Sequence, residues 1–326
     1  MKKKWSLFIV CVLGISVLFF FVIHRFIREA PSRTAEHTKR SYGAYFVSVA
    51  VSKFTQTDLP CLCVQIDNKT FSMELDLGFQ GDLTIESSFI NQISSKTLID
   101  IKDMYGFRGK AYPTNLYLIP KIEIGAMSFI QPILQENSEE FRQDGEIVQL
   151  GNNSSSHEPG RVGWELFHNV NLLLDLKNSK IAFCDSLETL KKQGYSFDNF
   201  VKIPLLIERG LVEFEAQSTK KTTLHCMLDT GSTWNILNTE IEPNKSIEQV
   251  AWEHESITEY PSFQIGNRDF GAVAFHLLPI KIPIRIDAIL GMEFFKEHLV
   301  FLDFSEKCIY FSKNHLFRDE DRSCLE

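Results

Sequence analysis

The sequence predicts an all-β fold made of two duplicated lobes that follow an amino-terminal transmembrane helix. Short runs of Val, Ile, Leu and Phe alternate with Gly, Asn, Asp and Pro, and helical periodicity is scarce. One order of motifs occurs twice, and an uncharged apolar segment stands near the amino terminus. We therefore divide the chain into a basic start (1–4), an anchor (5–24), a linker (25–42), two lobes (43–197 and 198–315) and a charged tail (316–326).

The composition is that of a globular protein of 326 residues with a formal net charge of −8. Phe accounts for 27 of these residues, an aromatic content that suits the cores of β-sheets. Phosphate contacts need a concentrated basic surface, and no Lys/Arg cluster occurs in the globular part. We therefore expect no binding of nucleic acid.

The segment from Trp5 to Ile23 contains no charged residue and is about long enough to cross a bilayer as one helix. A cleaved signal peptide is the alternative, since the lysines at 2–4 could also begin such a peptide. The long apolar run, and the arginines two residues before the candidate cleavage points, favour an uncleaved anchor. Basic residues flank both ends of this segment, so the side of the membrane stays open. We expect a single-pass membrane protein and favour an extracytoplasmic position for its globular part.

The sequence contains no pattern typical of a metal or nucleotide site. Its seven cysteines lack zinc-type spacing, and small buried thiols are their simplest interpretation. The nine histidines include no HExxH motif, and P-loop, GxGxxG and GxSxG motifs are missing as well. We therefore expect no metal and no cofactor.

The duplication starts from two short acidic motifs, Asp76-Leu77-Gly78 and, 153 residues later, Asp229-Thr230-Gly231. Shifting one half by that distance aligns LPCLCVQIDNKTFSMELD with LVEFEAQSTKKTTLHCMLD almost without gaps. Each stretch consists of an apolar strand, a polar turn and a second strand that ends in the motif Asp. This pattern predicts a β-hairpin in each half.

Three further features recur downstream in the same order. Each half has an I-x-I-G-like strand and turn (122–125 and 263–266), and then RVGWELF or ILGMEFF around a shared Gly. Each half closes with a strand, turn and strand, LLLDLKNSKIAF or VFLDFSEKCIYF, in which Asp175 and Asp303 take matching places and are expected to serve the turns. The repeated order predicts a duplicated β lobe, and we expect a monomer because both lobes belong to one chain.

The paired motifs also predict chemistry. Duplicated lobes generally pack about a pseudo-twofold axis, so we expect Asp76 and Asp229 to face each other at close range. Like charges so near to each other cannot both ionise cheaply, and the pair would share one proton. The ionised carboxylate could then take a proton from water while the protonated one donates to a substrate carbonyl. Such a pair would hydrolyse a peptide bond without a metal or a covalent intermediate, and the Gly of each motif would leave room for the tight turn.

At this point the sequence resembles a known family. DTGST at 229–233, followed by I-x-I-G and ILGMEFF, resembles the retropepsin-like aspartic proteases, and the duplication resembles the two-lobed pepsin-like fold. The resemblance covers about residues 45–312 and is strongest in the second half, where Gly291 follows Asp229 by 62 residues. It implies an aspartic endopeptidase that acts on a peptide or protein substrate, with Asp76 and Asp229 as catalytic residues. It also implies that four residues of the two turns support the active site, namely Gly78, Thr230, Gly231 and Ser232.

The first half departs from the family pattern at two positions. Leu77 stands where a Thr or Ser hydroxyl would bridge the floor of the site, and Phe79 stands where a small hydroxyl residue would hold the outer oxygen of Asp76. Thr230 and Ser232 can perform these two roles only on their own side. A drier setting should raise the pKa of Asp76, so we hypothesise that Asp76 is the protonated partner and that Asp229 is the base.

The stretch Tyr105-Gly106-Phe107-Arg108-Gly109 resembles the flap tip of pepsin-like enzymes, which makes Tyr105 and Gly106 candidate substrate-binding residues. A Gly-flanked aromatic residue is also common in ordinary hairpin turns, so both interpretations stay open. The polar stretch 135–160 is predicted to be a surface insertion.

Two other functions fit the same sequence. A catalytically weak or inactive homologue could act as a membrane-tethered binding or scaffold protein, as Leu77 and Phe79 suggest. The presence of both carboxylates argues against this, because an unused close pair of acids carries an electrostatic cost. A narrow processing enzyme is the third hypothesis, since a tether raises the effective concentration of one membrane-proximal substrate.

Overall fold

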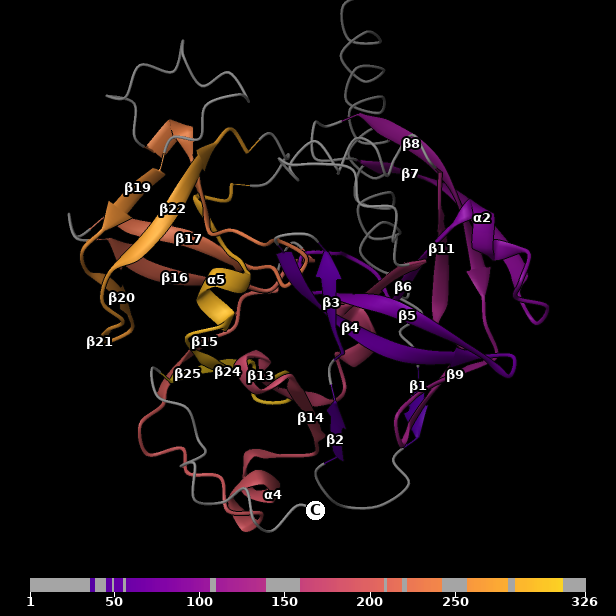
Figure 1. Ribbon diagram of the computed structural model, residues 1–326, viewed down its shortest axis with the longest axis horizontal. Coiled ribbons are helices and arrows are strands. Elements are labelled where there is room, and N and C mark those ends of the chain that lie inside the picture. Colours follow the sequence, from indigo (N-terminus) through magenta and orange to yellow (C-terminus); the bar gives the residue numbers. More distant parts are fainter. Residues whose placement is uncertain are drawn as a thin grey trace, which may run out of the picture. The chain divides into compact units, whose positions relative to one another are not determined.

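The structure, a computed structural model, describes residues 36–38, 45–48, 50–54, 57–105, 110–138, 159–207, 210–218, 222–241, 257–280 and 285–312. Side chains are described from residue 59 onward, except that of Tyr105. All these residues belong to one unit, Ala35–Glu326. They form three β-sheets and a few short helices, which confirms the mostly-β prediction (Figure 1). The helices are α2 (Ser87–Ile90), α4 (Leu187–Lys192), α5 (Met292–Phe295) and the 3-10 helices η1 (Trp164–Phe167), η2 (Leu176–Asn178) and η3 (Thr239–Ile241).

The predicted anchor at 5–24 lies outside the described residues. Among the helices that the structure does describe, none is both long and apolar enough to span a membrane. The membrane helix therefore stays a prediction, as do the boundaries of the linker, the lobes and the tail.

The first half of the chain builds an 11-stranded sheet in the order β1-β10-β9-β4-β5-β12-β6-β11-β8-β7, with β3 paired to β4. Its strands are β1 (Glu36–Thr38), β3 (Ala50–Phe54), β4 (Thr57–Ile66), β5 (Lys69–Asp76), β6 (Leu83–Glu86), β7 (Thr97–Tyr105), β8 (Ala111–Leu118), β9 (Lys121–Ile124), β10 (Met127–Ile130), β11 (Ile133–Asn137) and β12 (Gly160–Gly163). Asp76 is the last residue of β5, which lies between β4 and β12.

The second half builds an 8-stranded sheet in the order β19-β22-β18-β23-β17-β16-β20-β21. Its strands are β16 (Glu213–Ser218), β17 (Thr223–Leu228), β18 (Ile236–Asn238), β19 (Ile257–Tyr260), β20 (Phe263–Ile265), β21 (Arg268–Asp269), β22 (Val273–Leu278) and β23 (Ala288–Leu290). The run β16-β17-β23-β18-β22 repeats the order and the strand directions of β4-β5-β12-β6-β11, with parallel, antiparallel and parallel pairs in succession after the first hairpin. The duplication seen in the sequence is therefore a duplication of sheet topology.

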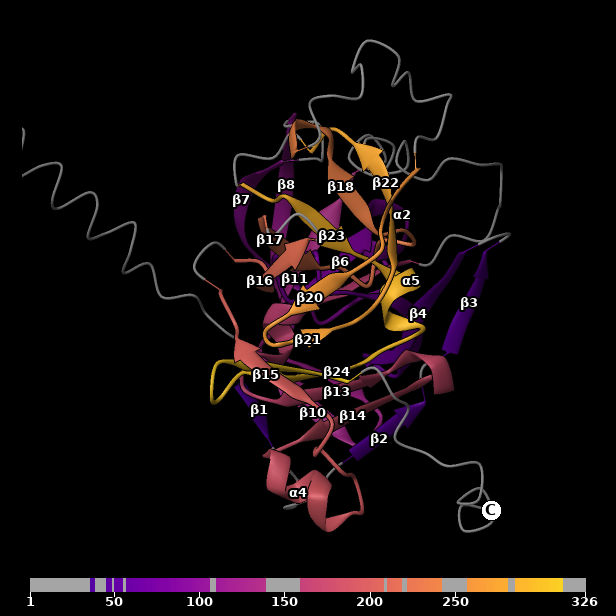
Figure 2. The same ribbon diagram turned by 90° about the vertical axis from the view of Figure 1, so that its left-hand side faces the viewer.

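A 6-stranded sheet joins the two halves in the order β15-β25-β24-β13-β14-β2. Its strands are β2 (Tyr45–Ser48), β13 (Asn171–Asp175), β14 (Lys180–Cys184), β15 (Val201–Pro204), β24 (Leu299–Asp303) and β25 (Cys308–Ser312). The closing hairpins of both halves meet here through β13 and β24, which lie side by side in Figures 1 and 2. Leu173 pairs with Phe301, its counterpart in the repeat, so the pseudo-twofold relation passes through this residue pair.

The turns of these sheets follow from their sequences. Asp67 and Asn68 have φ of 50° and 64° between β4 and β5, as a tight two-residue hairpin turn requires. Gly125 and Gly266 follow the I-x-I-G-like strands with φ of 57° and 59°, a region that favours glycine. The equivalent backbone conformation at both glycines confirms that these turns are repeated.

Asp175 and Asp303 serve the closing turns as predicted. Asp175 Oδ1 accepts from the backbone N–H of Asn178 at 3.4 Å, and Asp303 Oδ1 accepts from that of Glu306 at 3.0 Å. The Ser305 hydroxyl adds a second hydrogen bond to Asp303 Oδ1 at 2.7 Å. Both carboxylates thus satisfy backbone donors where the chain reverses.

In the described part of the chain, no two cysteines form a disulfide with each other. Cys61, Cys184 and Cys226 are buried, as the simplest interpretation of the sequence predicts, whereas Cys63 is exposed and Cys308 is half-buried. The other two cysteines lie outside the described residues.

Candidate active site

The two motif aspartates lie on turns with the same internal hydrogen bonds. Asp76 Oδ1 accepts from the N–H of Gly78 at 2.9 Å, and Asp229 Oδ1 accepts from the N–H of Gly231 at 2.9 Å. The carbonyls of the two aspartates accept from residues Phe79 and Ser232 at 3.2 and 3.3 Å. Each carboxylate is therefore aimed by its own turn before it meets the other half.

The two turns pack against each other in a reciprocal way. A Cβ atom placed on Gly78 would lie 2.5 Å from Cγ of Asp229, and one on Gly231 would lie 2.6 Å from Cγ of Asp76. Distances this short exclude any side chain, so each glycine makes room for the aspartate of the opposite half. The glycines are needed for this close approach rather than for a positive φ, which neither residue has. The structure thus brings Asp76, Gly78, Asp229 and Gly231 together.

Thr230 bridges the floor between the turns. Its hydroxyl donates to the carbonyl of Leu75 at 2.5 Å and accepts from the N–H of Leu77 at 3.1 Å, two groups of the opposite half. Thr230 is fully buried, so these bonds satisfy backbone groups that water does not reach. Leu77, its counterpart, has no hydroxyl and is buried in the core. The bridge is therefore one-sided, as the sequence predicts.

The position of Ser232 differs from the expectation. Its hydroxyl donates to the carbonyl of Trp234 at 2.8 Å and makes no described hydrogen bond with the Asp229 carboxylate. Phe79, the counterpart of Ser232, places its ring against Gly163, where an added Cβ would lie 2.6 Å from the ring. Ser232 therefore supports its turn through the backbone rather than by holding a carboxylate oxygen.

Arg161 is the residue of this site that sequence reasoning missed. It lies on β12, next to β5, and its Nη1 is 3.2 Å from Oδ2 of Asp76. Its Nε is 3.3 Å from Oε2 of Glu74, so one guanidinium contacts two carboxylates. The Asp76 side chain is only 6% exposed. A cation at this distance stabilises the ionised form of Asp76.

The electrostatics favour the opposite proton assignment from the one predicted from the sequence. Burial, the charge of Asp76 and a hydrogen bond with Asp76 raise the pKa of Asp229 well above its ordinary value, although Arg161 opposes this shift. Each carboxylate accepts one turn N–H, but Asp76 alone of the two has an ion pair with Arg161 among the described contacts. The contact between Arg161 and Asp76 argues against the hypothesis of a protonated Asp76 and a basic Asp229, which left out the arginine. The arrangement favours an ionised Asp76 and a protonated Asp229.

Two glycines hold the strands behind the turns. A Cβ on Gly163 would lie 2.2 Å from the carbonyl oxygen of Gly81, and one on Gly291 would lie 2.2 Å from that of Trp234. These glycines thus let β12 and the end of β23 approach the active-site turns closely. They support the site and carry no reactive group.

A second polar shell also differs between the halves. Asn235 accepts from the N–H of Gly291 at 3.0 Å, and Glu293 accepts from the N–H of Asn235 at 2.9 Å. Asp82 takes the matching place in the first half and accepts from the N–H of Ile133 at 2.8 Å. Burial, together with the charge of Glu165, raises the pKa of Asp82 to about 7 despite that hydrogen bond. Aligning the repeat beyond the motifs would have identified both positions.

The candidate flap is described only in part. β7 and β8 form an antiparallel hairpin in which Tyr105 pairs with Ala111. Gly106 and the rest of the tip lie outside the described residues, and so does the greater part of the predicted insertion at 135–160. The substrate-binding role of Tyr105 and Gly106 stays a prediction.

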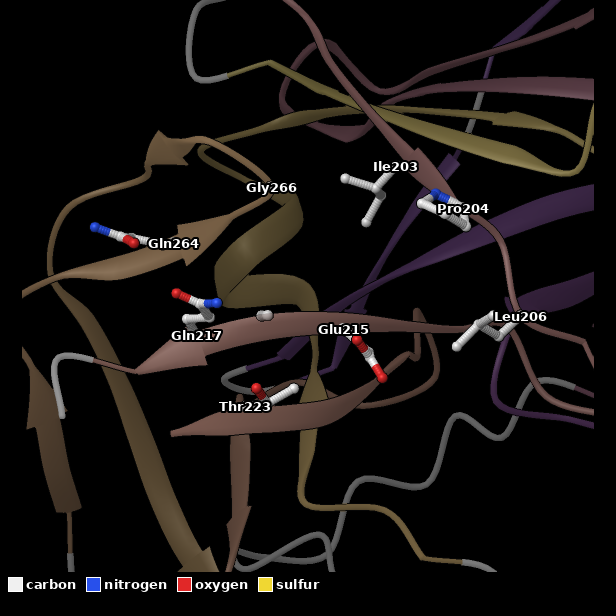
Figure 3. A pocket seen from close by; sticks show the side chains of 9 residues that line it. Ile203, Pro204, Leu206, Glu215, Gln217, Thr223, Gln264 and Gly266 are labelled. Carbon is white, nitrogen blue, oxygen red and sulfur yellow. The ribbon is translucent and has the colours of Figure 1, made fainter. Parts of the chain in front are cut away.

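A pocket of about 380 Å³ lies away from the aspartates, between β15, β16 and β20 (Figure 3). Figure 3 shows the side chains of Glu215, Gln217, Thr223 and Gln264 at its edge. No residue of the two active-site turns lines this pocket. In the described part of the chain, no group of three or more His, Cys, Asp or Glu side chains could hold a metal ion.

Comparisons with solved structures support the fold. The chain has a pepsin-like fold. Conglutin gamma, a basic 7S globulin from lupine seeds, superimposes with a TM-score of 0.56 at 12% sequence identity, covering 85% of this chain and 96% of the globulin. The basic 7S globulin from soybean gives a TM-score of 0.54 at 11% identity, with the same coverage of 85% and 96%. At these identities the likeness extends to the fold alone.

Sequence comparisons name no family for this chain: no protein-family profile matches it, and no curated protein does.

Proposed function

We propose that this chain is an aspartic endopeptidase whose acid–base pair is Asp76 and Asp229. The observation that supports the proposal is the reciprocal packing of the two turns, in which Gly78 and Gly231 each lie against the carboxylate of the other half. Thr230 adds a hydrogen-bonded bridge below the pair. Two buried acids in contact destabilise a fold through repulsion and desolvation. A purely structural role for the two aspartates does not account for this cost.

The chemistry follows from the proton distribution. Asp76 accepts a proton from a bound water as the water oxygen bonds to the peptide carbon, and Asp229 donates its proton to the carbonyl oxygen. The resulting tetrahedral diol then collapses. Asp76 returns its proton to the amide nitrogen, the C–N bond breaks, and one diol hydroxyl gives its proton back to Asp229. The atoms and protons balance, and the pair ends in its starting state.

A second candidate is a binding or scaffold protein of the same fold that does not hydrolyse peptides. Arg161 favours it, because its guanidinium lies on the carboxylate oxygen that would take the proton from water. Leu77 favours it too, because the bridge below the pair is one-sided. The fold comparisons support this candidate better than the first, since both printed names are those of globulins and neither is that of a protease.

In either case we propose that residues 5–24 tether the protein to a membrane. A tethered peptidase or binding protein would meet a membrane-proximal peptide or protein at a raised effective concentration. A narrow processing enzyme with one such substrate therefore belongs to the first proposal.

Peptide-pool cleavage by the full-length chain in detergent micelles tests these proposals. We expect cuts between acid and neutral pH that a statine-type inhibitor blocks, and a loss of about 100-fold or more in both Asp76→Asn and Asp229→Asn. Because both substitutions are nearly isosteric, near-ultraviolet circular dichroism can verify that the variants fold. A folded wild type that cuts no peptide and no membrane-proximal protein would refute the first proposal and leave the second.

A further inference from the structure

Arg161 takes the place of an apolar residue in the other half. In the first half, β5 and β12 are parallel neighbours whose register pairs Glu74 with Arg161. In the second half, β17 and β23 are related in the same way, and their register pairs Met227 with Ile289. An ion pair in one lobe thus replaces an apolar pair in the other, beside one aspartate only.

The guanidinium is held in place from several directions. Its Nε lies 3.3 Å from Glu74 and its Nη1 lies 3.2 Å from Asp76, so the two acids fix its orientation. The backbone N–H of Arg161 donates to the hydroxyl of Thr84 at 3.1 Å, which ties β12 to β6. The side chain of Arg161 is 39% exposed to solvent, whereas that of Glu74 is 13% exposed. The cation is therefore positioned by the protein but not sealed from water.

We propose that Arg161 is a positioning residue that holds Asp76 as the ionised member of the pair, leaves the shared proton on Asp229, and moves the working pH of the pair downward. This inference rests on the proposed function, because it assigns the roles of base and acid within that same site. It also identifies the physical cause of the asymmetry, which is one fixed cation beside one of two like acids.

The other charged groups around Arg161 do not provide this cation. Glu74 on β5 and Asp229 after β17 are both acids, and the charges of Asp76 and Glu74 stabilise the charged guanidinium against the cost of its burial. Asp82, which precedes β6, and Glu165, which follows β12, are acids as well. Lys102 on β7 is a further cation, whose charge opposes the rise in the pKa of Glu165. The cation that acts on the pair itself is Arg161. An opposite charge this close lowers the pKa of a carboxyl group by about 1 to 3 units.

The second half supplies the test variant. Glu74→Met combined with Arg161→Ile copies the Met227–Ile289 pair into the first half and removes Glu74 together with its cation, so that Asp76 is the acid that loses its partner. Replacing a buried ion pair by apolar residues is often neutral or stabilising, so the variant should fold. Arg161→Gln removes the charge with less change of shape and gives a second route to the same result.

Carboxyl titration by ¹³C NMR of the full-length chain in micelles, with labelled Asp, provides a readout that does not need catalysis. Asp76→Asn and Asp229→Asn assign the two signals. We expect the lower of the two midpoints of the pair to rise by about 1 to 3 pH units in both charge-removing variants, and the acidic limb of any cleavage profile to move in the same direction. Because the titration can be followed in a protein that cuts nothing, failure of the proposed function would not hide this result.

A matched control lies in the second half. Arg285→Ile removes a guanidinium whose Nε is 3.1 Å from Oδ1 of Asp287, an ion pair outside the active-site turns. We expect this variant to leave both midpoints of the pair unchanged. An unchanged lower midpoint in the Glu74→Met/Arg161→Ile and Arg161→Gln variants would overturn the proposal, and so would an equal shift in Arg285→Ile.

Discussion

At the scale of single residues, the two halves differ most where they carry charge. Asp82 and Asn235 take the same place after their motifs, yet one side chain can ionise and the other cannot. Asn235 receives the Gly291 N–H, and Asp82 receives the Ile133 N–H in a buried setting. An acid that is buried beside another acid stores a pH-dependent contribution to stability that an amide does not.

We predict that Asp82→Asn stabilises the protein at neutral pH. Burial and Glu165 raise the pKa of Asp82 from an ordinary 3.8 to about 7, so the folded state binds more protons than the unfolded state between these values. The contribution of Asp82 to the free energy of unfolding is therefore fully present below the unfolded pKa of 3.8 and is lost as the pH rises to about 7. The free energy of unfolding of the variant, relative to wild type, should increase from pH 4 to pH 7 by on the order of 2 kcal/mol. Urea unfolding across this range measures it.

Asp67→Asn is the control of opposite sign. Burial alone would raise the pKa of Asp67, but hydrogen bonds from Ser95 and Ser94 outweigh it and lower the value. Its contribution is present above the unfolded pKa and is lost as the pH falls, so the relative stability of this variant should decline from acid to neutral pH. If the two variants followed the same course, the assignment of Asp82 would be wrong.

At the scale of secondary-structure elements, the closing hairpins are the most faithful repeat. β13–β14 and β24–β25 have the same length on each strand and an aspartate at the same place. Both carboxylates accept a backbone N–H three residues further on. The conformation of these turns is thus set by local hydrogen bonds that the sequence itself encodes.

We predict that Asp175→Ala and Asp303→Ala each lower the free energy of unfolding by about 1 kcal/mol. The reason is the same in both, namely the loss of the acceptor for a turn N–H. Urea unfolding of the two variants should give similar changes, because each also loses a side-chain donor, the Asn178 amide at Asp175 and the Ser305 hydroxyl at Asp303. Glu259→Ala, an exposed strand position, should change stability by less than about 0.5 kcal/mol. A negligible effect at both aspartates would contradict this account of the turns.

At the scale of the whole molecule, the 6-stranded sheet makes the two halves depend on each other. β13 and β24 are its central strands, and each would become an open edge without the other half. Leu172, Leu174 and Phe301 are fully buried in this region. Neither half can therefore be completed by its own strands alone.

We predict that the globular part unfolds in one cooperative transition and that residues 1–197 or 198–326, produced alone in micelles, lack native near-ultraviolet circular dichroism. Separation would expose the apolar side chains between β13 and β24 and leave their backbone groups unpaired. Mixing the two fragments should restore part of the native signal. Two independent transitions, or a fragment with a native spectrum, would show that the halves fold separately.

Sequence reasoning predicted what is repeated and missed what is not. The motifs, the I-x-I-G-like turns and the closing aspartates each occur twice, so the topology and the meeting of the two turns could be inferred. The role of Arg161 in the site could not be inferred, because the RV before Gly163 looks like an incomplete version of the apolar IL before Gly291. Its contact with Asp76, 85 residues away along the chain, depends on the register between β5 and β12. For the same reason the sequence alone favours a protonated Asp76, whereas the contact with Arg161 favours a protonated Asp229.

Because the two halves belong to one chain, a cation can stand beside one aspartate and not the other. A symmetric assembly of identical subunits could not have this unequal charge. Two copies of the first half would bring an arginine to each aspartate, and two copies of the second half would bring none. Leu173 and Phe301, which are equivalent in the repeat, pair with each other in the joint sheet. Arg161 and Ile289 are also equivalent, but only Arg161 carries a charge. The backbone is therefore symmetric where the charges are not. One covalent chain is therefore enough to give two chemically equal acids different protonation states.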